Sequence, residues 1–345
     1  MHWQAALSGP SGPHTLGTAS LRARGKAEDG SACTITVQLW YPIDDTQALP
    51  PRPASQLVLK LSHPNWAPAW HGALPVRAPR RLPLIVYVPD ATGRHDENTF
   101  MLANLASHGF VLAAIHDPFR ERKAPFGLAS SRPHAQGSSD SIARGARTAS
   151  ILLDALEELD QGDTAVWANR LDLTNVGIMG FSLGGAVAAE ATQTDFRYVA
   201  AANLAGPIGA RLVTVPYLVM LSELSPSNTP TNIRPPKNAR DVLTHRRARH
   251  QAALPKCHIM EVDGARREHF SDRPGSPWWL SASRPAPADK RIRTIIDAYT
   301  VAFFSTYVQN GKHPLMCVSH SPYAEVQFAT GMPSRRIHRA PAARQ

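Results

Sequence analysis

The chain is poor in cysteine and has no long apolar run. Its 345 residues include only three cysteines, and these stand far apart, at Cys33, Cys257 and Cys317. An odd number of distant thiols favours reduced, packed side chains over a disulfide framework or a zinc knuckle. No segment reaches the roughly 18 consecutive apolar residues that a transmembrane helix requires. The sequence therefore predicts no membrane span, no disulfide framework and no metal site.

A recognisable secretory leader is also missing. The first ten residues, MHWQAALSGP, contain neither a basic n-region nor an apolar h-region. We therefore expect a cytoplasmic protein.

Acidic residues are in the minority. The chain has 27 of them against 37 lysines and arginines, which gives a formal charge of +10 and a pI of about 9.9. Such an excess would suit nucleic acid, because basic side chains release counterions from phosphates. However, much of it lies in two loop-like stretches, 234–250 and 335–339, which lack interleaved aromatic residues and any recognised binding motif. We expect a solvated basic surface and no nucleic-acid partner, with a binder of anionic polymers as the weakest alternative.

The length and the hydrophobic content of 43% favour one large α/β domain. We expect it to cover residues 31–318, after a polar N-terminal segment at 1–30 and before a basic, disordered tail at 319–345. Irregular excursions are expected near residues 50–81, 120–141 and 224–250.

Continuous apolar runs predict the type of sheet. Residues 84–88 and 110–115 are both unbroken apolar runs, and a helix-compatible segment, 98–108, lies between them. Unbroken apolar strands joined by a helix indicate a parallel sheet that is covered on both faces. Further strands are expected at 198–204, 217–222 and 258–262, and further helices at 146–159 and 290–308.

The most informative stretch is GFSLGG at residues 180–185. A strand-like segment precedes it, and a helix start rich in small residues follows. The glycines remove side chains that would collide around a strained serine. This pattern is typical of a nucleophile elbow, which would present the Ser182 hydroxyl for attack and the Leu183 amide for an oxyanion. The alternative is a glycine-rich turn that only packs.

Several further segments carry a family resemblance. They are VQLWYP at 37–42, LASHGFV at 105–111, the elbow, GA at 264–265, FSD at 270–272 and AYTVAFF at 298–304. Through most of residues 30–318 the chain resembles the bacterial relatives of platelet-activating-factor acetylhydrolase. These relatives are also labelled dienelactone-hydrolase-like and belong to the α/β-hydrolase superfamily. The resemblance implies an α/β-hydrolase fold and a serine esterase that acts on small-molecule esters with short or oxidised acyl groups. It also implies that no metal or organic cofactor is needed.

Two positions of the family's catalytic machinery are changed. The resemblance places the acid after an Asn-Leu pair, and here the pair at 203–204 is followed by Ala205. It places the histidine three residues before Phe270, and that position holds Arg267. An alanine cannot orient an imidazole, and a guanidinium cannot act as a general base because it stays charged.

The expected oxyanion loop also departs from the family. Relatives carry His-Gly or Pro-Gly after the first long strand, whereas this chain has Asp90 and Ala91 there. The Ala91 backbone is the candidate second oxyanion donor, but an inward Asp90 carboxylate would oppose the developing negative charge. For Arg267 we favour an ion pair with Glu268, Asp263 or Glu223 over binding of a substrate anion. Asp272 is expected to cap or brace its loop.

Nearby residues could replace the missing parts. His269 lies two residues after Arg267, and Glu223 follows a predicted strand at a place where many α/β-hydrolases carry their acid. The order Ser182, Glu223, His269 matches the superfamily order of nucleophile, acid and base. The simpler interpretation of His269 is a loop histidine, and that of Glu223 is a surface glutamate. Two functions remain open: a serine hydrolase with a rearranged triad, and a degenerate hydrolase with a binding or regulatory role. The oligomeric state is left undetermined.

Overall fold

A computed structural model describes residues 10–26, 30–44, 69–77, 81–119, 139–162, 166–223, 247–248, 251–272, 287–318 and 320–328. Within these residues the strands form one sheet in the order β10-β9-β8-β7-β6-β4-β5-β2-β1-β3. The strands are β1 (Leu16–Lys26), β2 (Ala32–Pro42), β3 (Ala69–His71), β4 (Leu82–Val88), β5 (Val111–His116), β6 (Leu171–Phe181), β7 (Tyr198–Leu204), β8 (Tyr217–Glu223), β9 (Cys257–Arg266) and β10 (Val326–Phe328).

The centre of the sheet is parallel. Strand β4 pairs in parallel with β5 and β6, and β6, β7, β8 and β9 continue the parallel pairing. The edges are antiparallel where β2 meets β5, β1 meets β2 and β10 meets β9. The unbroken apolar run predicted to be a central strand, residues 84–88, is fully buried within β4. The predicted fold class is confirmed, because strands apolar on both sides must be covered on both faces.

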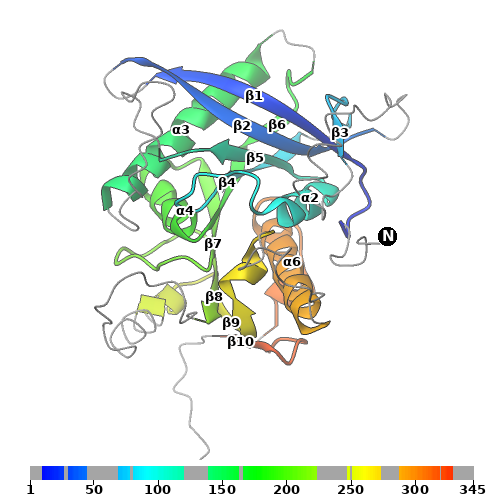
Figure 1. Ribbon diagram of the computed structural model, residues 1–345, viewed down its shortest axis with the longest axis vertical. Coiled ribbons are helices and arrows are strands. Elements are labelled where there is room, and N and C mark those ends of the chain that lie inside the picture. The colour runs from blue at the N-terminus through cyan, green and yellow to red at the C-terminus, as the bar shows by residue number, and fades with distance from the viewer. Residues whose placement is uncertain are drawn as a thin grey trace, which may run out of the picture.

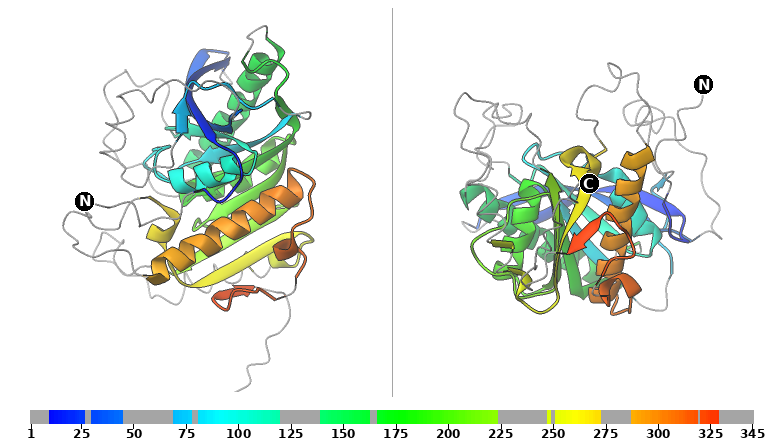
Figure 2. Two further views of the ribbon diagram at one scale, coloured as in Figure 1. Left: turned by 90° about the vertical axis from the view of Figure 1, so that its right-hand side faces the viewer. Right: turned by 90° about the horizontal axis from the view of Figure 1, so that it is seen from below.

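Helices cover both faces of the sheet. One face carries α3 (Ser139–Gln161) and α4 (Leu183–Thr194), and the opposite face carries α2 (Thr99–Ser107) and α6 (Pro287–Tyr307) (Figures 1 and 2). Each pair of helices packs into its own hydrophobic cluster. None of the described helices is long and apolar enough to cross a membrane.

The sheet extends beyond the predicted domain boundaries. Strand β1 lies inside the segment 1–30, and β10 lies inside the tail 319–345. Main-chain pairing explains β1, because it pairs with β2 over its whole length although several of its side chains are exposed. The domain therefore runs from at least Leu16 to Phe328. Most of the predicted excursions lie outside the described residues, as do residues 1–9, 27–29, 319 and 329–345 of the two end segments.

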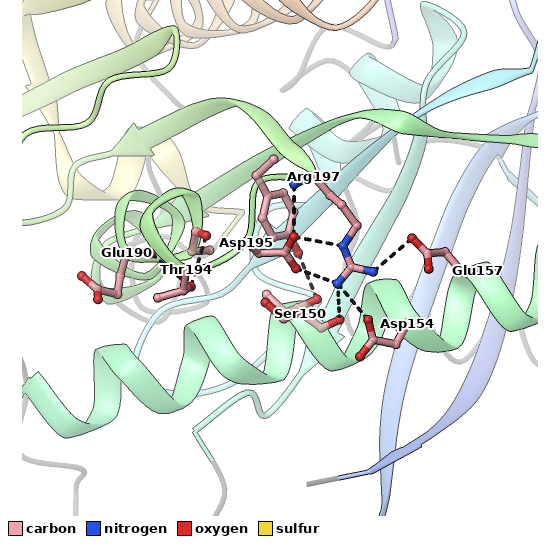
Figure 3. Close-up of polar contacts among 10 residues, drawn as sticks. Ser150, Asp154, Glu157, Glu190, Thr194, Asp195 and Arg197 are labelled. Carbon is pink, nitrogen blue, oxygen red and sulfur yellow. Dashed lines mark hydrogen bonds and ion pairs between the residues drawn. The ribbon is translucent and has the colours of Figure 1, made fainter. Parts of the chain in front are cut away.

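An arginine cluster joins three elements at the amino end of β7. Arg197 donates from Nε to Asp195 Oδ1 over 2.9 Å and from Nη1 to Glu157 Oε1 over 3.0 Å. Its Nη2 lies 2.7 Å from Asp195 Oδ2, 2.8 Å from Asp154 Oδ1 and 3.3 Å from the Ser150 carbonyl oxygen (Figure 3). Burial alone would raise the pKa of Asp195, but the hydrogen bonds from Arg197 outweigh burial and lower it. The cluster fastens α3 to the turn between α4 and β7.

Candidate active site

Ser182 occupies a sharp turn between β6 and α4. Its backbone has φ 54° and ψ −117°, a conformation that costs a non-glycine residue about 1–3 kcal/mol. The Ser182 amide donates to the Leu204 carbonyl over 2.8 Å, which fixes the turn against β7. A Cβ at Gly180 would overlap the Gly184 carbonyl, and one at Gly184 would overlap the Val88 carbonyl. The predicted strained turn at the carboxyl end of a central strand is therefore present, and the glycines are needed for its close packing.

The two candidate oxyanion donors follow adjacent strands. Leu183 is the first residue of α4, where backbone amides have no partner within the helix. Ala91 lies in the turn after β4, and Val88 of β4 pairs in register with Gly180 of β6. The structure thus brings both loops to one edge of the sheet, and the donor roles of Leu183 and Ala91 stay predictions.

Arg267 contacts the serine directly. It begins the short 3-10 helix η1 (Arg267–Phe270), and its Nη1 donates to Ser182 Oγ over 2.5 Å. Its Nη2 donates to Asp90 Oδ2 over 2.9 Å. The guanidinium carbon lies 4.7 Å from the centre of the Phe181 ring, in a cation–π contact. A charged group therefore occupies the place where the resemblance puts the base.

Asp90 is turned towards this site and is neutralised there. Its Oδ1 accepts hydrogen bonds from the Thr92 amide and hydroxyl, over 2.7 Å and 2.6 Å, while Oδ2 binds Arg267. Our expectation of an ion pair between Arg267 and Glu268, Asp263 or Glu223 is corrected, because Arg267 pairs with Asp90, from a loop far away in sequence. The inward Asp90 carboxylate was singled out from the sequence, but its pairing with Arg267 was missed.

His269 is held away from the serine. Its side chain is only 3% exposed, its Nδ1 accepts from the Arg266 amide over 2.8 Å, and its Nε2 lies 2.9 Å from Asp289 Oδ1. Because Nδ1 accepts, the Nε2–H donates to the carboxylate. Both ring nitrogens are therefore used, and the structure does not bring His269 and Ser182 together. Asp289 lies in the first turn of α6 and was not identified from the sequence.

The candidate acids differ in position. Glu223 is the last residue of β8 and its backbone is in register with Arg266 of β9, but its side chain lies outside the described part of the structure. Ala205 follows β7 with φ 53°, and its amide donates to the Met220 carbonyl over 2.9 Å. This left-handed conformation is one that Asp and Asn tolerate better than Ala. The backbone at 205 thus suits the residue that the resemblance expects there.

Asp272 caps α2, as predicted. Its Oδ2 accepts from the Thr99 amide and hydroxyl, over 2.6 Å and 2.5 Å, and its Oδ1 accepts from the Phe100 amide over 3.3 Å. Burial raises the pKa of Asp272, although these hydrogen bonds act in the opposite direction. The Asp272 amide also donates to the Glu97 carbonyl over 2.6 Å. The loop that carries Arg267 is therefore fastened to the loop that carries Asp90.

Within the described part of the chain, the site offers donors to Ser182 but no imidazole base. Among the described residues, no group of three or more His, Cys, Asp or Glu side chains is arranged to hold a metal ion. Ser182 Oγ bonds with Arg267, and the His269 ring bonds with the Arg266 amide and Asp289, so the described contacts do not join the serine to the imidazole. As described, the arrangement can bind a hydrogen-bond acceptor, but it cannot remove the serine proton through an imidazole.

Comparison with solved structures identifies the scaffold. A ferulic acid esterase from Streptomyces cinnamoneus matches with a TM-score of 0.66 and 23% sequence identity, over 94% of this chain and 99% of that chain. The chain has the α/β-hydrolase fold. No family model and no curated protein matches it. In the α/β-hydrolase fold the nucleophile precedes the acid and the base along the chain, and the order of Ser182 and Arg267 fits this scheme, while the role of Ser182 as nucleophile stays a prediction.

Proposed function

We propose that this α/β-hydrolase-fold protein uses its serine site to bind a small molecule and not to hydrolyse an ester. The observation that carries the proposal is the hydrogen bond of 2.5 Å from Arg267 Nη1 to Ser182 Oγ. A serine hydroxyl becomes a nucleophile when a neighbouring base takes its proton. A guanidinium stays charged, so an arginine at this place cannot take that proton.

The contact with Arg267 also occupies part of Ser182 Oγ. One of its two lone pairs accepts from Arg267 Nη1 and is not offered to an acyl carbon. Removal of a triad member from a serine hydrolase costs several orders of magnitude in kcat. With Arg267 in place of histidine and Ala205 in place of the acid, we expect no ester turnover above background.

Labelling with a fluorophosphonate tests the proposal, because such probes require an activated serine. Folded wild-type protein should not be labelled, and it should not hydrolyse 4-nitrophenyl acetate faster than Ser182→Ala. An active serine esterase under the same conditions controls for probe quality. Stoichiometric labelling that disappears in Ser182→Ala would contradict the proposal.

A second candidate is an ester hydrolase of the type that the sequence resembles. The strained conformation of Ser182 favours it, because strain of this kind is common where a reactive side chain is presented. Such an enzyme would form an acyl-enzyme on Ser182 of an ester with a short or oxidised acyl group. Glu223 would act as acid and His269 as base, with Leu183 and Ala91 as oxyanion donors. His269 would first have to leave Asp289.

Substitution of His269 separates the two candidates. In the second candidate, His269→Ala lowers ester hydrolysis about as severely as Ser182→Ala, because both remove a reacting group. In the binding proposal, His269→Ala disturbs the loop of Arg267 and reduces stability, and there is no activity for it to lower. Measurable wild-type turnover that is lost in His269→Ala would establish the second candidate.

A further inference from the structure

Arg267 has hydrogen-bond donors to spare. A guanidinium carries five N–H groups. The contacts described for Arg267 are one with Ser182 and one with Asp90, made by Nη1 and Nη2. The Arg267 side chain is 34% exposed, so a small molecule can reach it. The remaining donors are therefore available to an acceptor group.

Ser182 adds a donor of its own. Because its Oγ accepts from Arg267, the hydroxyl hydrogen is free to point towards another acceptor. The guanidinium of Arg267 lies over the face of the Phe181 ring. This contact does not use the N–H groups at the edge of the guanidinium plane, which can still donate hydrogen bonds. A ligand at this place meets donors from two side chains at once.

The charges around Arg267 favour a monoanion over a dianion. Asp90 already neutralises the guanidinium across 2.9 Å. The neighbouring Arg266 is engaged by Glu268 at 3.1 Å and by Asp289 at 3.5 Å, so it adds little free positive charge. A phosphate monoester would bring up to two negative charges to a neutralised pair, whereas a carboxylate brings one. A carboxylate also matches the planar fork of an arginine in a two-point contact.

We propose that Ser182 and Arg267 together bind the carboxylate of a small organic acid. The proposal rests on the proposed function, since an organic acid is the class of molecule that an ester hydrolase releases and that a site without a base would only hold. Asp90 is a positioning residue in this arrangement. It fixes the guanidinium and is itself fixed by Thr92.

Calorimetric titration of the full chain with three matched probes tests this assignment. The probes are benzoate, the neutral benzamide and phenyl phosphate. Benzoate should bind at least about tenfold more tightly than benzamide, because a charge-assisted hydrogen bond is worth about 1.5–3 kcal/mol. Phenyl phosphate should bind more weakly than benzoate.

Variants assign the binding to the two side chains. Arg267→Met should weaken benzoate roughly 10- to 100-fold, Arg267→Lys should weaken it less, and Ser182→Ala should weaken it about fivefold. Arg211→Met is the matched control, because Arg211 is 65% exposed and pairs with Glu190 away from the elbow. It should leave benzoate affinity unchanged. Thermal unfolding of each variant shows whether it is folded.

Three results would overturn the assignment. They are no binding of benzoate by the wild type, equal benzoate affinity in wild type and folded Arg267→Met, and tighter binding of phenyl phosphate than of benzoate. The fluorophosphonate test is read separately. Labelling of Ser182 removes the proposed function even if benzoate binds, whereas failure of benzoate to bind unlabelled protein removes only the carboxylate assignment.

Discussion

Two arginines of this protein have opposite surroundings. Arg197, at the amino end of β7, has five described contacts through Nε, Nη1 and Nη2, with carboxylates on three residues and one carbonyl. Arg267, at the carboxyl end of the sheet, has one carboxylate, one serine hydroxyl and the face of a phenylalanine ring. The Arg197 side chain is 18% exposed, against 34% for Arg267.

Their different contacts give the two arginines different roles. Acceptors engage all three nitrogens of Arg197, with carboxylates on three residues, so its role is to join α3 to β7. Arg267 is fixed in orientation by one contact from Nη1 and one from Nη2, so its other N–H groups can serve a ligand. Substitution of Arg197 should therefore be measured as stability, and substitution of Arg267 as binding or chemistry.

The largest effect is expected from restoring the family's residues. In Arg267→His combined with Ala205→Asp, ester hydrolysis should rise at least about 100-fold over wild type, because a base and its orienting carboxylate each supply orders of magnitude. The position of Arg267 beside Ser182 Oγ and the left-handed backbone at Ala205 support this expectation. Hydrolysis of 4-nitrophenyl acetate is the measurement.

The control for this gain is Ser182→Ala in the same double variant, which should return hydrolysis to background. A folded double variant no better than wild type would count against simple loss of the family's machinery. In that case the Asp90 carboxylate would be the next residue to replace, because it faces the site.

Loss of the Arg197 side chain should lower the free energy of unfolding. Arg197→Met leaves Asp195, whose side chain is 6% exposed, without its partner, and removal of one member of a buried ion pair costs about 3–5 kcal/mol. Partial exposure of Asp154 and Glu157 places the expected loss near the lower bound, at about 3 kcal/mol. Chemical denaturation measures it. A loss below about 1 kcal/mol would show that Arg197 does not hold α3 against the turn before β7.

The same cluster should give an acid-dependent stability. The pKa of Asp195 is lowered from 3.8 in the folded protein, so the unfolded chain binds the proton more readily. Stability from this group is present above about pH 4 and is lost as the pH falls through the folded-state pKa. The difference in unfolding free energy between wild type and Arg197→Met should therefore narrow as the pH falls below 4. If the difference between wild type and Arg197→Met does not change with pH, the loss of stability in the variant comes from packing alone.

The smallest effect on stability is expected from substitution of Arg267. Arg267→Met leaves Asp90 bonded to the Thr92 amide and hydroxyl, and a methionine can still cover the Phe181 ring. Because the Asp90 side chain is only 10% exposed, the loss of its charged partner still has a cost, and we expect about 1–2 kcal/mol in chemical denaturation. A loss equal to that of Arg197→Met would remove the distinction between the two arginines.

The fold could be predicted because its signals are local. Unbroken apolar runs mark the central parallel strands, and the glycines around Ser182 mark the sharp turn, since a side chain there would overlap a carbonyl. Strand β1 was missed because most of its residues are small or polar, and it depends on main-chain pairing with β2. Strand β10 was missed because three residues carry too short a pattern.

The candidate site was predictable only in part. Ser182, Arg267 and Asp90 were each recognised from their positions, but their contacts join residues far apart in the sequence, and no spacing rule predicts such pairs. His269 illustrates the limit. Its place in the sequence suited a base, while its hydrogen bonds to the Arg266 amide and to Asp289 of α6 depend on how η1 packs against that helix.

The most direct test of the account is the rate of fluorophosphonate labelling at Ser182, measured side by side in the wild type, in Ser182→Ala and in Arg267→His combined with Ala205→Asp. No labelling of the wild type above Ser182→Ala and clear labelling of the double variant are expected, because the double variant places an imidazole and its orienting carboxylate at the family's positions beside the serine hydroxyl. Rapid labelling of the wild type, at the rate of an active serine esterase, would contradict it. That result would show that Ser182 is activated despite its hydrogen bond with Arg267.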